Sequence, residues 1–115
     1  LNPDGQKSLH FINTKSGTMI IFDDTASKEQ VQLITAEGHS KIEISVEDES
    51  ISIETEADLQ LSAKKAVSIN AEEIEITSKN QVNIPADEFQ TKISKELSIN
   101  ADKDITLKGS GIALN

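Results

Sequence analysis

The sequence contains no Cys, Trp, Tyr or Arg. The lack of Cys excludes disulfides, cysteine-bound zinc and thiol catalysis, and it is compatible with either redox environment. Only three Phe supply aromatic surface, although aromatic side chains usually carry much of a globular core. Ile, Leu, Val and Ala make up nearly all of the apolar residues, so we expect a core that suits small, stiff side chains.

Positive charge is also scarce, because 20 acidic and 11 basic residues give a net charge of −9. Binding to nucleic acid or to anionic lipid depends on clustered basic residues, so both are disfavoured. No apolar run approaches the roughly 18 residues of a transmembrane helix, and the first residues do not resemble a signal peptide. Because the chain begins at Leu1 rather than at Met, we expect a fragment of a longer protein.

A short apolar–x–apolar motif recurs from residue 42 to the C-terminus. Its first members lie at 42, 51, 59, 67, 74, 82, 89, 97, 105 and 112, a mean spacing close to eight residues. Both members lie on one face of a strand, whereas residues i and i+2 of a helix point to opposite sides. Small residues such as Ala63, Ala71 and Ala101 stand four residues after the first member. We expect corners there, with the following polar segment turning the chain.

Each eight-residue unit, or octad, provides only two apolar side chains. A single-chain β-solenoid normally needs longer coils with several strands per turn. The sequence therefore predicts an all-β, intertwined homotrimeric triple-stranded β-helix, a triangular β-prism whose monomer has little stability of its own. The predicted trimer core consists of Ile42, Ile44, Ile51, Ile53, Leu59, Leu61, Val67, Ile69, Ile74, Ile76, Val82, Ile84, Phe89, Leu97, Ile99, Ile105 and Leu107.

Residues 9–46 do not follow the octad spacing. LHFINTKSGTMIIF indicates two strands around a Lys-Ser-Gly turn, and FDDTASKEQ indicates a polar loop. VQLI and KIEISV indicate two more strands, joined by the turn TAEGHS. We therefore expect two domains, with residues 1–41 as an N-terminal collar of β-hairpins and residues 42–115 as an octad-repeat shaft.

The stretch HFINTKSGTMIIFDDTASKEQVQL resembles the neck of VgrG-type spike proteins. The octads that follow, among them VSINA, IEITS and ITLKG, resemble the shaft of the same family, so the resemblance covers residues 9–115. Related spikes occur in contractile phage tails and phage-tail-like particles. The resemblance implies a homotrimeric β-prism that punctures a target membrane when a contractile sheath drives it forward.

The resemblance also implies partners. A cone-shaped tip protein of the Pro-Ala-Ala-Arg-repeat (PAAR) type would sit on a blunt C-terminal end, docked on Gly111, Ile112, Ala113, Leu114 and Asn115. An N-terminal hub and barrel, which this sequence lacks, would join the spike to the tail tube. The family implies assembly on a contractile particle in the cytoplasm or in a virion, then injection across the target envelope with transient membrane contact. Type VI secretion and a phage particle both stay open.

A function of another class is the stem of a phage tail fibre or adhesin that binds host glycans. Such a protein needs aromatic-lined sugar sites, which this chain lacks, so the spike is favoured. A single-chain β-helix enzyme would need longer coils and a cluster of carboxylate or basic side chains. We therefore expect a structural protein with no enzymatic activity, no catalytic residues and no cofactor.

Few polar side chains suggest a site. His10 falls in a predicted strand and His39 in a turn, and neither occupies the apolar phase of an octad, so we interpret both as solvated rather than as metal ligands. Asp23 and Asp24 point apart on an extended chain, which indicates a turn or cap rather than acid catalysis. The acidic octad residues lack the repeat of calcium-binding nonapeptides, so we interpret them as a solvated face.

One octad departs from the pattern. Its first member is Phe89, its second is Thr91, and Ile93 takes the small position. Either Phe89 and Thr91 face inward together, or the phase slips to Thr91 and Ile93. Pro85 lies just before and cannot donate a ladder hydrogen bond, so we expect a local bulge or widening here.

Overall fold

The structure is a computed structural model that describes residues 9–115. Residues 1–8 of the predicted collar therefore lie outside the described residues. The chain divides into two units, Leu1–Ile69 and Asn70–Asn115. The all-β class predicted from the sequence is confirmed, because the regular elements of the described chain are five antiparallel strands and one short 3-10 helix.

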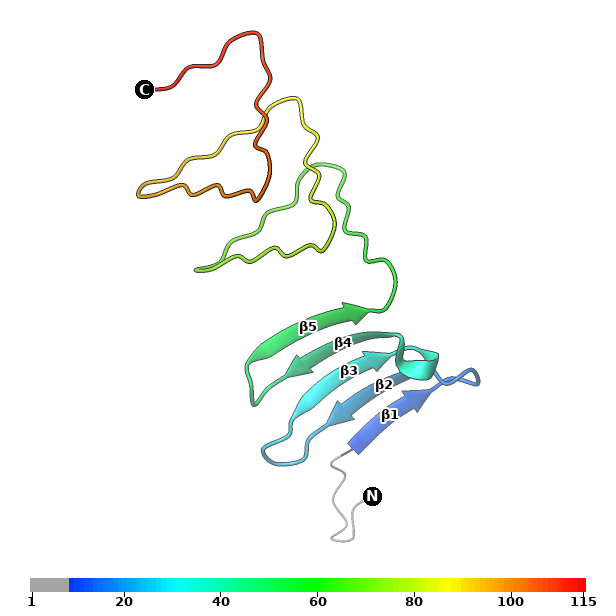
Figure 1. The fold of residues 1–115 in the computed structure, drawn as a ribbon. Helices are drawn as coiled ribbons and strands as arrows, with labels where there is room; N and C mark the ends of the chain where they lie inside the picture. Colours follow the sequence, from blue (N-terminus) through cyan, green and yellow to red (C-terminus); the bar gives the residue numbers. More distant parts are fainter. Residues whose placement is uncertain (1–8) are drawn as a thin grey trace. The chain divides into compact units, whose positions relative to one another are not determined.

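The five strands form one antiparallel meander in the order β1-β2-β3-β4-β5 (Figure 1). They are β1 (Leu9–Asn13), β2 (Met19–Asp23), β3 (Gln30–Ile34), β4 (Ser40–Ser45) and β5 (Ser50–Thr55). The 3-10 helix η1 (Ala36–Gly38) lies between β3 and β4. The four strands predicted within residues 9–46 are confirmed as β1 to β4. The first two octad pairs lie in β4 and β5, which pair with each other.

The turns are specified by local hydrogen bonds. In the β1–β2 turn, Gly17 has φ +99° and its N–H donates to the carbonyl of Thr14 at 3.0 Å. After β2, the Asp23 carboxylate accepts a hydrogen bond from the backbone N–H of Thr25 at 2.9 Å, which confirms the predicted turn role of Asp23. Hydrogen bonds from the side chain and backbone of Thr25 lower the pKa of Asp23 below its ordinary value.

The strand register collects one pair of residues from every strand on the same face. One row across the sheet is His10, Phe22, Val31, Ile44 and Ile51. The parallel row is Ile12, Ile20, Leu33, Ile42 and Ile53. We call these ten residues the apolar face. The collar strands thus carry the same kind of pair as the octads, although their spacing along the sequence is longer.

The opposite face of the sheet changes in character from β1 to β5. On β1, β2 and β3 it carries the apolar residues Leu9, Phe11, Met19, Ile21 and Ile34 together with the polar residues Asn13, Asp23, Gln30 and Gln32. On β4 and β5 it carries Lys41, Glu43, Ser52 and Glu54. Lys41 Nζ lies 3.1 Å from Glu43, and the Gln32 side-chain amide donates to Glu43 at 2.9 Å. Lys41 and then Gln32 lower the pKa of Glu43 below its ordinary value.

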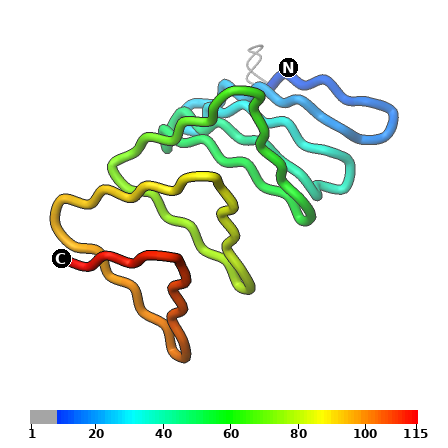
Figure 2. Tube along the Cα trace, turned by 90° about the horizontal axis from the view of Figure 1, so that it is seen from above, coloured from blue at the N-terminus to red at the C-terminus, as the bar shows by residue number. Residues whose placement is uncertain are grey.

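After β5 the chain consists of extended segments separated by bends. The bends begin at residues 56, 64, 72, 79, 87, 94, 102 and 110, in each case five residues after the first member of an apolar pair. This confirms that the polar segment of each octad turns the chain. In residues 70–115, the segments and corners follow an open, three-sided coil (Figure 2). Residues 57–115, all of which are described, contain no strand and no backbone–backbone hydrogen bond.

No side chain among residues 9–115 is buried. The accessible surface of the chain is 11,682 Å², whereas a compact monomer of 12.5 kDa exposes about 6,200 Å². The chain therefore exposes about 5,500 Å² more than a self-contained domain of its mass. The described chain also contains no helix with the length and apolar character that a membrane crossing requires.

Candidate functional site

The largest candidate site is the exposed apolar surface. All of the predicted trimer-core residues are exposed, from 39% for Ile42 to 79% for Leu61. Side chains of this kind each contribute roughly 1.5–3 kcal/mol when they are fully buried. No part of the described chain covers them.

Within the sheet, the apolar face brings four of the predicted core residues together with collar residues. Ile42 lies opposite Ile53, and Ile44 lies opposite Ile51, so their side chains share one surface. The register extends that surface across β3 and β2 as far as β1. The collar contribution was not predicted from the sequence, because its pairs are separated by hairpin turns of unequal length.

The remaining predicted core residues lie in the extended segments that follow β5. Each pair from Leu59/Leu61 to Ile105/Leu107 stands before a bend, at the same distance from it. The Phe89 octad keeps this phase, since its bend begins at Ser94. This regular spacing favours Phe89 and Thr91 as the pair over the slipped phase of Thr91 and Ile93. The predicted bulge or widening does not appear in the spacing of the bends.

The predicted tip-docking residues form the last extended segment. Gly111 follows the bend at Ser110, and the pair Ile112 and Leu114 is exposed, with Leu114 at 88%.

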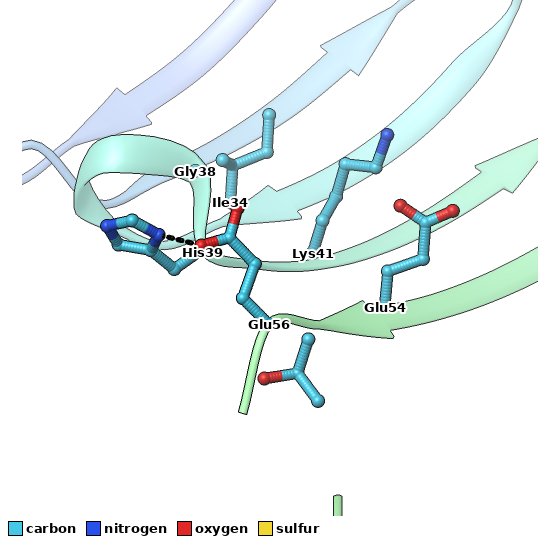
Figure 3. Close-up of a pocket in the computed structure, with 7 residues that line it drawn as sticks. Ile34, Gly38, His39, Lys41, Glu54 and Glu56 are labelled. Carbon is cyan, nitrogen blue, oxygen red and sulfur yellow. Dashed lines mark hydrogen bonds and ion pairs between the residues drawn. The ribbon is translucent and has the colours of Figure 1, made fainter. Parts of the chain in front are cut away.

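A second candidate site lies where the chain leaves the sheet. Here a pocket of about 320 Å³ is lined by Ile34, Gly38, His39, Lys41, Glu54, Thr55 and Glu56 (Figure 3). The backbone N–H of Glu56 donates to the carbonyl of His39 at 2.9 Å. The Ser40 and Thr55 hydroxyls lie 3.1 Å apart and are hydrogen bonded. We call the contacts between residues 39–40 and residues 55–56 the exit clamp.

His39 adds an ionic contact to the exit clamp. Its Nδ1 contacts the Glu56 carboxylate, and its Nε2 lies 3.1 Å from the Glu37 carboxylate (Figure 3 shows the first contact). Glu56 and then Glu37 raise the pKa of His39 above its ordinary value, because both hydrogen bonds favour the protonated ring. The His39 side chain is 55% exposed, in agreement with the predicted solvated histidine, and it has two carboxylate partners that the sequence did not predict. The hydrogen bonds and ion pairs of the exit clamp indicate a structural role for these residues.

His10 is exposed, in agreement with the predicted solvated histidine. The prediction that it lies outside the apolar phase is wrong, because the register puts His10 on the apolar face opposite Phe22. The available signal was the spacing His10–x–Ile12, which matches the spacing of an octad pair. Because His is not an apolar residue, the apolar–x–apolar motif does not include the pair His10 and Ile12.

Comparison with known proteins adds no family to these observations. No protein-family model and no curated protein sequence matches the chain.

Proposed function

We propose that this chain is the shaft of a homotrimeric membrane-puncturing spike in a contractile injection machine. The observation that carries the proposal is the state of residues 57–115. Their apolar pairs are exposed, their corners are evenly phased, and their backbone makes no hydrogen bond to the backbone of the described chain. A segment of this kind needs other copies to complete it, because strands are stabilised by pairing and by burial of one face.

The three-sided coil of residues 70–115 supports three chains rather than one. In a single-chain β-helix, successive turns lie about 4.8 Å apart and are hydrogen bonded. The described turns have no such bonds, so their backbone groups are available to pair with strands of other copies. Three interleaved chains place two strands from other copies between successive turns. The 5,500 Å² or so of excess surface per chain is in the range of obligate interfaces.

The proposed function is mechanical. Ten octads that each advance by one strand spacing give a shaft of about 45–50 Å. Axial force on such a shaft is shared by many interchain hydrogen bonds, so no single chain is pulled out without breaking several levels together. Three chains at −9 each give −27, which favours solubility and disfavours adhesion to acidic surfaces.

The mass in solution tests the assembly. Light scattering on residues 1–115 is expected to give three times the chain mass of 12.5 kDa. A mass of one chain over a wide range of protein concentration refutes the proposal, because a single chain leaves the apolar surface uncovered.

Tip binding tests the role in injection. A PAAR-type tip protein is expected to be captured by the trimer and to be lost when residues 109–115 are deleted or when Leu114 is replaced by Asp. Asp102→Ala, a change in a polar corner segment, is the matched control and should leave capture unchanged. Equal capture by the deletion variant and the intact chain rejects this docking face.

A further inference from the structure

His10 occupies a position that every other strand of the sheet fills with an apolar residue. It stands opposite Phe22, two residues before Ile12, just as Phe22 stands two residues after Ile20. The other nine members of the apolar face are Ile, Leu, Val or Phe. In the described part of the chain, His10 has no hydrogen-bond partner and makes no ion pair.

In the proposed homotrimer, the position of His10 on the apolar face applies to three His10 side chains, one from each copy. If the apolar face lines the interior, the threefold axis brings three copies of His10 to one level. Imidazole nitrogens that leave water without a partner are costly, by roughly 1–3 kcal/mol for each unsatisfied group. The neighbouring Ile12, Ile20 and Phe22 side chains have no polar atom to offer. A single ion on the axis can satisfy one nitrogen of each of the three rings at once.

We propose that three copies of His10 form a site for one divalent transition-metal ion on the trimer axis, at the β1 level of the spike. This inference rests on the proposed homotrimer. Neutral imidazole is a common ligand of Zn²⁺, Co²⁺ and Ni²⁺, and three imidazoles leave further coordination positions for water. Within one chain, no three His, Cys, Asp or Glu side chains among the described residues are grouped to hold a metal ion, so the site is incomplete without the partner copies.

Cobalt provides the probe, because its visible absorption reports nitrogen ligation directly. Untagged residues 1–115 are titrated with Co²⁺ while the mass is measured on the same samples. We expect one Co²⁺ per three chains. The His10→Leu variant, which puts an apolar side chain in an apolar position, should remain trimeric and bind cobalt at least tenfold more weakly. The His39→Gln variant removes the only other histidine and should bind cobalt with unchanged stoichiometry.

The outcomes separate the site from the assembly. A trimer that binds no cobalt, or one that loses cobalt through His39→Gln and keeps it in His10→Leu, overturns the His10 site and leaves the shaft proposal intact. A monomer that gives no cobalt spectrum overturns the shaft proposal and the site with it. Zn²⁺ displacing the cobalt spectrum at the same one-to-three stoichiometry supports the site.

Discussion

Replacing Ile74 tests the inward phase of the octads most directly. Ile74 is the first member of the pair Ile74/Ile76, and it is 56% exposed in the single chain. If the trimer buries that remaining area, each copy contributes about half of the 1.5–3 kcal/mol of a fully buried side chain. Three copies then contribute roughly 2–4.5 kcal/mol per trimer. Ile74→Ala should therefore weaken the trimer by about 10²–10³-fold in its equilibrium constant.

Ile74→Asp is the stronger form of the same change. It removes the apolar contribution and places three carboxylates in a dry core, where each costs several kcal/mol more. We expect no trimer at micromolar concentration, measured by light scattering and by sedimentation. The neighbouring residue Glu75 points to the opposite side of the extended chain, so Glu75→Ala is the matched control and should assemble normally. Normal assembly of Ile74→Asp, or equal damage from both positions, would refute the assignment of the inward face.

Three further changes test the sheet and its exit clamp. At pH values below 6.5, where protonated His39 is fully paired, His39→Gln should lower the thermal unfolding midpoint. The difference from the parent should shrink as the pH rises through the raised pKa of His39, because the parent then loses the same contact. Asp23→Asn should destabilise the sheet above pH 4, because the lowered pKa of Asp23 shows that its charged form stabilises the fold. The substitution should have less effect at lower pH, where acid protonates Asp23 in the parent. Gly17→Val should destabilise the sheet by about 1–2 kcal/mol, because φ +99° disfavours any residue with a Cβ. The neighbouring control Ser16→Val should lower the stability of the sheet less. The unfolding midpoint of both variants is measured by circular dichroism.

The hairpins and the corners could be predicted from the sequence because their causes are local. Gly17 marks a turn by its own conformational freedom, and the polar segments after each octad pair mark bends at a constant distance. The strands between them are rich in Ile and alternate in character, which is a property of the residues and not of the partner.

The cross-strand relations could not be predicted in the same way. The alignment of His10 with Phe22, and of Ile20 with Leu33, depends on the lengths of turns that differ from hairpin to hairpin. The contact between His39 and Glu56 joins residues 17 positions apart, through a 3-10 helix on one side and the end of β5 on the other. Spacing along the sequence does not carry this information, so the apolar face and the exit clamp became visible only in three dimensions.

The different bonding of residues before and after Glu56 affects how the shaft folds. Each strand of the sheet pairs with its sequence neighbour, so the meander forms from local contacts and quickly. In the proposed trimer the octads can pair only after other chains have bound, and their similar sequences then favour pairing in the wrong register. VSINA at 67–71 and LSINA at 97–101 are so alike that a strand could pair several levels out of register at little cost. If three copies of the sheet align first, they fix the register of the first octads, and the following octads then pair in register toward Asn115.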